Sequence, residues 1–313
     1  ADLAGEIAPC DAFVSVNETD QCRRAPAGAF RESLQWVNDM SYLKRGIAGH
    51  VGLWCSPSES HRQKYLTDPL WQQIERTQEH PNGAEQYVPD PSKWCVVPLG
   101  CDPENFPAVE KVSGKVVYCS SPDRGSHWLL QEWPAIKAAV PHATLEIYYH
   151  VERWLRSFDA TPHFPAIEPL RSRALYIEEC LRRFKAAGGM GVTVRDSVSR
   201  DVIEREMASA EVCAYPVDTT TWSEGFSCTI LECCAAKAGP VVTTCDAIGE
   251  VYASIDPVKM GDGWQVEWRN RVIRALTDET WRNEQNEKAR QLAEQLTWKR
   301  TAEELCKQIE SRK

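Results

Sequence analysis

Short apolar runs alternate with amphipathic stretches of helical length along most of the chain. In the first hundred residues, four runs have the composition of β-strands: 12–16, 34–38, 51–56 and 94–100. Between the third and fourth runs, residues 58–66 predict a helix with Ser58 as its N-cap.

The alternation is more regular after residue 114. Four further strands are predicted at 115–121, 143–150, 192–198 and 211–216. Helices are predicted between and beside them at 126–139, 169–187 and 201–210, the first interrupted by Pro134. Strands separated by helices of this length predict an α/β fold with a parallel, doubly wound sheet. Residues 101–114 have the composition of a linker between two domains.

Composition and charge exclude several classes of protein to which the chain could belong. The 313 residues are 42% hydrophobic, which is enough for two domains. A net charge of -9 with scattered Lys and Arg argues against a nucleic-acid partner. No apolar run approaches the roughly 20 residues of a transmembrane segment. The 13 cysteines contain no C-x-x-C pair, which favours a reduced, cytoplasmic protein over a disulfide scaffold or zinc site.

Two acids stand in the mostly apolar stretch "SEGFSCTILECCAAKAGPVVTT", which begins at residue 223. A helix is expected to begin near 226–229, which places Glu224 in the preceding loop and Glu232 at least one turn inside the helix. Burying an unpaired carboxylate is unfavourable, so these acids need an explanation. Two explanations remain open. Glu224 can act as a charge at the helix N-terminus with Glu232 as the buried partner of an Arg, or both acids can belong to a ligand site at the carboxyl edge of the sheet.

The acids and their context carry a family resemblance. The pattern Glu, seven residues, Glu, with "GFS" after the first acid, resembles the donor-site motif of retaining GT-B glycosyltransferases, and glycosyltransferase family four in particular. The resemblance extends, in order, over 96–106, 116–150, 192–216 and 296–310. It implies two Rossmann-like doubly wound domains facing a cleft.

The resemblance implies roles for individual residues. Arg124 of "PDRG" is similar to the basic residue that neutralises the departing diphosphate, and Glu224 to the acid that contacts the donor sugar. Asn38 falls where relatives often have a histidine, and Ser120 where many have a second basic residue. Glu232 would bind the ribose hydroxyls. The other implied donor contacts are Gly225, Phe226, Ser227 and Thr229, with Ser197 and Val198 at the base.

Domain boundaries follow from the same resemblance. Residues 1–101 would form a partial acceptor-side domain, 102–295 the donor-binding domain, and 296–313 a helix that crosses back to the first domain. The opening strand and glycine-rich loop of a GT-B first domain have no counterpart in 1–101. The first domain is therefore expected to be incomplete, either in a fragment or in a reduced domain. A partner chain could cover its open face.

The resemblance implies transfer of a sugar from a UDP- or GDP-linked donor to a glycan, lipid or small-molecule acceptor. With a lipid acceptor, the enzyme would sit peripherally at the membrane. No D-x-D occurs, so metal-independent chemistry without a further cofactor is expected, and no G-x-G-x-x-G indicates a dehydrogenase. The alternative is a non-catalytic module that binds a nucleotide sugar or glycan; a nucleotide-sugar epimerase is a weaker option.

Overall fold

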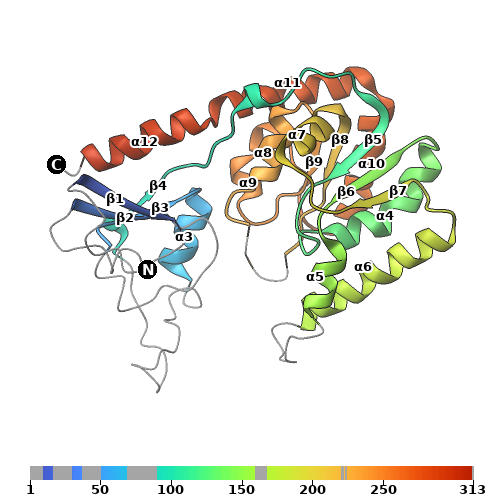
Figure 1. Ribbon diagram of the computed structural model, residues 1–313, viewed down its shortest axis with the longest axis horizontal. Helices are drawn as coiled ribbons and strands as arrows, with labels where there is room; N and C mark the ends of the chain where they lie inside the picture. The colour runs from blue at the N-terminus through green and yellow to red at the C-terminus, as the bar shows by residue number, and fades with distance from the viewer. Residues whose placement is uncertain are drawn as a thin grey trace. The chain divides into compact units, whose positions relative to one another are not determined.

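The computed structural model describes residues 10–16, 30–36, 51–68, 90–158, 168–219, 222 and 224–311. The chain divides into two compact units, which are described separately. The first unit comprises 1–99, 223–226 and 298–313, and the second comprises 100–222 and 227–297 (Figure 1).

A four-stranded parallel sheet forms the centre of the first unit. Its strands follow one another in space in chain order: β1 (Cys10–Val16), β2 (Phe30–Trp36), β3 (Leu53–Ser56) and β4 (Trp94–Val96). The second strand begins four residues earlier than predicted. The fourth is shorter than predicted, and Pro98, which has no amide hydrogen, follows shortly after its end.

Two helices belong to this sheet. Helix α3 (Glu59–Thr67) begins as predicted, because the Ser58 hydroxyl accepts a hydrogen bond from the His61 amide at 3.1 Å. Helix α12 (Trp298–Glu310) packs Leu305 and Ile309 against a small core in β3 and the segment after β4. The α12 hydroxyl of Thr301 also donates to the Pro98 carbonyl at 2.8 Å.

The second unit contains a five-stranded parallel sheet in the order β7-β6-β5-β8-β9. Its strands are β5 (Val112–Tyr118), β6 (Thr144–Tyr148), β7 (Val192–Arg195), β8 (Ala210–Tyr215) and β9 (Pro240–Val242). The parallel, doubly wound sheet predicted from the alternation is confirmed. The first strand begins at Val112, inside the segment expected to be a linker.

Helices cover both faces of this sheet (Figure 1). One set comprises α4 (Ser126–Ala139), α6 (Glu168–Ala186) and α10 (Trp264–Thr277), with α4 in contact with the other two. The other comprises α7 (Arg200–Ser209), α8 (Cys228–Ala235) and α11 (Glu279–Gln295). Two shorter helices are α5 (Val151–Ser157) and α9 (Ile248–Val251).

The expected break at Pro134 is wrong, because α4 continues through it. Proline removes one backbone hydrogen bond from a helix interior. The apolar face of α4 is fully buried around that position, with Leu129, Leu130, Trp133 and Ile136 at most 1% exposed. Tertiary packing therefore outweighs the local preference.

Strand order creates a switch point between β5 and β8. From β5 the chain continues to β6 on one side, whereas β8 continues to β9 on the other. In open α/β sheets, ligands bind at such a point, outside the carboxyl ends of the strands. The segments that follow β5 and β8 are therefore the expected place for a ligand. No helix in the described residues is long and apolar enough to cross a membrane.

Candidate functional site at the carboxyl edge of the five-stranded sheet

The loop after β5, residues 119–125, is held in a fixed conformation. The Tyr118 hydroxyl donates to the carbonyls of Ser121 at 2.7 Å and Arg124 at 3.1 Å. Gly125 has φ +87°, and a Cβ there would lie 1.8 Å from the Pro216 carbonyl oxygen. Only glycine allows this approach, so the loop is anchored to the chain that leaves β8.

Two predicted site residues lie on this loop. The Arg124 side chain is 23% exposed, and its Nε lies 3.6 Å from the Asp123 carboxylate. The Ser120 hydroxyl shares a 2.8 Å hydrogen bond with the hydroxyl of Tyr215, the last residue of β8. Both therefore lie at the switch point between β5 and β8.

The start of α8 lies at the same edge. Ser227, which precedes the helix, has φ +85°, a left-handed conformation that is unfavourable for a residue with a side chain. The Tyr252 hydroxyl donates to its carbonyl at 2.5 Å and holds it there. Thr229 donates from its hydroxyl to the Cys119 carbonyl at 3.2 Å, which joins α8 to the end of β5. Strained residues of this kind concentrate at functional sites.

Glu232 lies one turn into α8 and is 19% exposed. Its Oε1 accepts a 2.7 Å hydrogen bond from Nη1 of Arg200, the first residue of α7. Among the described residues, no hydrogen-bond donor meets the other oxygen, Oε2. The Arg partner considered from the sequence is present, but its own side chain is 55% exposed.

Burial shapes the electrostatics around Glu232. It raises the pKa of the Glu232 carboxyl above the ordinary 4.5, while the hydrogen bond and charge of Arg200 oppose that shift. The carboxylate also affects its surroundings: burial, followed by the charge of Glu232, raises the pKa of the Cys101 thiol to about 12. Glu232 is thus a partly buried acid that forms an ion pair with the half-exposed side chain of Arg200.

The remaining predicted residues lie elsewhere. Ser197 and Val198 are exposed in the segment between β7, an edge strand, and α7. Glu224, Gly225 and Phe226 belong to the first unit, where the Ser58 hydroxyl donates to the Gly225 carbonyl at 2.7 Å. Asn38 lies outside the described residues.

A second polar cluster, around Asp218, was not found from the sequence. Asp218 follows β8, and its Oδ2 accepts hydrogen bonds from Trp128 Nε1 at 2.7 Å and Arg173 Nη2 at 3.0 Å. His127 Nε2 lies 3.8 Å from the same oxygen. Burial, followed by the Arg173 charge, lowers the pKa of His127 from 6.5 to about 4, so the ring is neutral near pH 7. The donors come from α4 and α6, a pairing that sequence spacing does not reveal.

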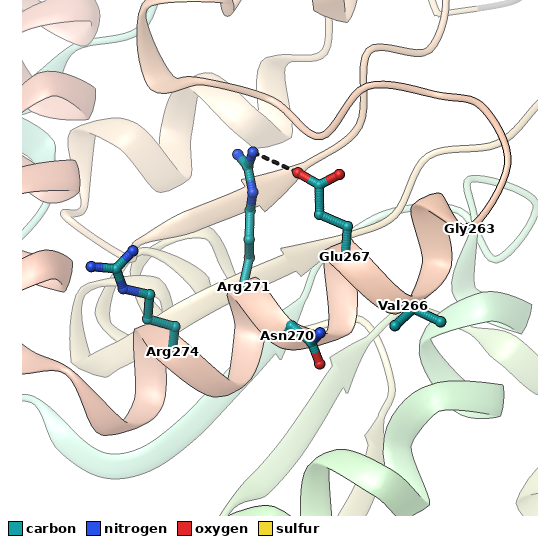
Figure 2. A pocket seen from close by; sticks show the side chains of 6 residues that line it. All are labelled: Gly263, Val266, Glu267, Asn270, Arg271 and Arg274. Carbon is teal, nitrogen blue, oxygen red and sulfur yellow. Dashed lines mark hydrogen bonds and ion pairs between the residues drawn. The ribbon is translucent and has the colours of Figure 1, made fainter.

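A hollow of about 400 Å³ lies on α10, away from these groups. Its lining residues all come from this helix or its N-cap: Gly263, Val266, Glu267, Asn270, Arg271 and Arg274 (Figure 2). Figure 2 also shows Arg271 paired with Glu267, at 2.8 Å. With no second element to form an opposite wall, this hollow is not assigned as a site. The described residues also contain no cluster of three or more His, Cys, Asp or Glu side chains suited to a metal ion.

Neither the protein-family models nor the curated proteins contain a match to this sequence. Solved structures do match. The pneumococcal O-GlcNAc transferase GtfA, solved with UDP and GlcNAc, has a TM-score of 0.65 at 11% identity, over 98% of this chain and 58% of its own. TarM, from S. aureus, has a TM-score of 0.66 at 10% identity, over 98% of this chain and 56% of its own.

The α,α-trehalose-phosphate synthase (UDP-forming) of Burkholderia vietnamiensis has a TM-score of 0.64 at 10% identity. It matches over 99% of this chain and 76% of its own. At such identities the likeness concerns the fold. The α/β GT-B fold expected from the sequence is therefore confirmed. The chain spans little more than half the length of GtfA and TarM.

Proposed function

We propose that this protein is a retaining glycosyltransferase, similar to glycosyltransferase family four, that uses a UDP- or GDP-linked sugar. One observation carries the proposal: Glu232 lies partly buried beside the switch point, with a single half-exposed cation and one carboxylate oxygen without a donor among the described residues. A carboxylate in this state is suited to accept hydrogen bonds from a ribose diol.

The other groups at this edge suit a diphosphate. Arg124 supplies a positive charge, and the first amides of α8 lie at the positive end of a helix. As the donor bond breaks, negative charge develops on the diphosphate, and these groups would stabilise it without a metal ion. Thr229 and Ser227 would contribute hydroxyl and backbone contacts, whereas Ser120 would replace a second cation.

Three assignments rest on the family resemblance alone. Glu224 would contact hydroxyls of the donor sugar, Asn38 of the first domain would face the donor sugar, and Ser197 with Val198 would contact the base. The acceptor is a glycan, lipid or small molecule. GtfA is also described in a complex with GtfB, which makes a partner chain worth testing here.

A donor screen tests the proposal. UDP- and GDP-linked hexoses and N-acetylhexosamines are each incubated with the protein and candidate acceptors, with and without EDTA, and free nucleotide release is followed. We expect release with one donor, insensitive to EDTA, and abolished in Arg124→Ala. Nucleotide binding without release under any condition would favour the non-catalytic module instead. Release that requires manganese would contradict the metal-free mechanism.

A further inference from the structure

Arg200 occupies an unusual place at the beginning of α7. A cation at the amino end of a helix is opposed by the helix dipole. Arg200 is the first residue of that helix, and its guanidinium lies between two carboxylates. Nε donates to Glu204 Oε1 at 2.6 Å, and Nη1 donates to Glu232 Oε1 at 2.7 Å. The pair of acids offsets the unfavourable position.

The planar shape of the Arg200 guanidinium allows it to contact both carboxylates. Two different nitrogens of one planar group each contact a separate carboxylate, and the group lies 5.9 Å from the centre of the Phe106 ring. Lysine offers a single point charge and cannot reproduce two such fixed directions. Arg200 therefore joins α7, α8 and the segment before β5 at one point.

Few charges act on Glu232 in the described part of the chain. Arg200 lowers the pKa of its carboxyl, and Glu204, also on α7, raises it. Neighbouring Cys101 and Cys119 have raised thiol pKa values and are neutral near pH 7. On α11, Arg290 donates to the Ala235 carbonyl at the far end of α8. Among these groups, only Arg200 favours the ionised form of Glu232.

We infer that Arg200 is a positioning residue of the donor site: it fixes Oε1 of Glu232 and leaves Oε2 to accept the ribose hydroxyls of a nucleoside diphosphate. The inference rests on the ribose role proposed for Glu232. Arg200 acts through Glu232 and need not touch the donor. With Oε1 held, the carboxylate meets the diol in one orientation, which reduces the ordering cost of binding.

The test measures the affinity of UDP and of GDP by calorimetry between pH 5 and 8. The variants are Arg200→Ala, Arg200→Gln, Arg200→Lys and, as a matched control, Arg205→Ala. Arg205 is an exposed residue of the same helix and has no contact with Glu232 among the described residues. For the nucleotide that binds wild type, we expect Arg200→Ala and Arg200→Gln to weaken affinity about tenfold at pH 7.

The pH profile separates positioning from a merely structural role. Affinity requires ionised Glu232, so it is present above the Glu232 pKa and falls as the pH drops through it. Without Arg200 that pKa rises further, so the fall should begin at higher pH. Arg200→Lys keeps the charge and should retain a profile near that of wild type with an intermediate affinity. Arg205→Ala should change neither quantity.

The outcomes also separate this inference from the proposed function. Glu232→Ala is measured in the same series. If it weakens nucleotide binding while Arg200→Ala and Arg200→Gln do not, the ribose role stands and the positioning role is overturned. Tighter binding in the Arg200 variants, or a loss with an unmoved pH midpoint, also overturns it. If neither residue affects affinity, the proposed ribose role itself fails.

Discussion

One buried and one partly buried acid of the second unit lie towards opposite edges of its sheet, the edges at which the strands begin and end. Glu211, at the amino end of β8, uses both oxygens: one meets Arg282 Nη2 at 3.0 Å, and the other accepts from the Gly114 amide at 2.7 Å. Its partner Arg282 is 12% exposed. Glu232, towards the carboxyl edge, meets one guanidinium that is 55% exposed and has an oxygen without a donor in the described residues.

The difference is the one expected between an acid that holds the fold together and one that is available to a ligand, the role proposed for Glu232. Glu211 is fully paired with groups that are themselves buried, so its surroundings are complete. The partner of Glu232 can move into water at little cost, and burial holds the pKa of Glu232 above its usual value. Groups that remain incompletely paired in a folded protein mark sites where a ligand completes them.

The largest loss of stability is expected from a substitution of Glu211, at the amino edge of the sheet. Glu211→Ala leaves Arg282 buried without its carboxylate, and breaking such a pair lowers the free energy of unfolding by about 3–5 kcal/mol. Denaturant unfolding measures this, and the affinity of the folded fraction for UDP or GDP should not change. A loss below about 1 kcal/mol would show that the two acids do not differ as described.

A smaller loss of stability is expected from a substitution of Gly125, in the loop that carries Arg124. Gly125→Ala adds an overlap with the Pro216 carbonyl to the cost of a positive φ, together about 2–4 kcal/mol of unfolding free energy. Gly189→Ala is the matched control, because Gly189 has φ +90° and no atom within 4 Å of an added Cβ. The control should cost only about 1–2 kcal/mol. Equal losses in both variants would mean that the loop is not fixed against β8.

His127 is expected to make the free energy of unfolding depend on pH. Its folded pKa of about 4 lies below the ordinary 6.5, so its contribution to stability is present above pH 6.5. That contribution is lost as the pH falls towards 4, with a slope of at most about 1.4 kcal/mol per pH unit. His127→Gln should flatten the slope in this window. An unchanged slope in His127→Gln would assign the acid sensitivity to other groups.

The sequence predicts the fold well because periodicity reports burial directly. The alternation after residue 114 gives β5, β6, β7 and β8 to within a few residues, and Ser58 correctly marks the start of α3. Boundaries shift where tertiary contacts decide them. Pro134 remains inside α4 because its buried neighbours stabilise the helix, which no local pattern shows.

The candidate site is only partly visible in the sequence. The spacing of Glu224 and Glu232 points to the segment in which Glu232 meets Arg200, but it does not reveal that the two acids fall in different units. Arg200 lies 32 residues before Glu232 in an ordinary charged helix. Likewise, Asp218 follows β8, whereas its partners Trp128 and Arg173 lie on α4 and α6. These residues are far apart in the sequence and meet only in the folded domain. Such pairs depend on topology.

The most direct test of the ribose role compares UDP or GDP with its 2′,3′-dideoxy counterpart, by calorimetry, on wild type and Glu232→Gln. We predict that wild type binds the dideoxy form about tenfold or more weakly, because charge-assisted hydrogen bonds are lost. Glu232→Gln should bind both forms equally weakly, while its unfolding free energy at pH 7 is unchanged or higher, since a raised folded pKa means that ionised Glu232 disfavours the fold. Full discrimination between the two forms in Glu232→Gln would contradict the account.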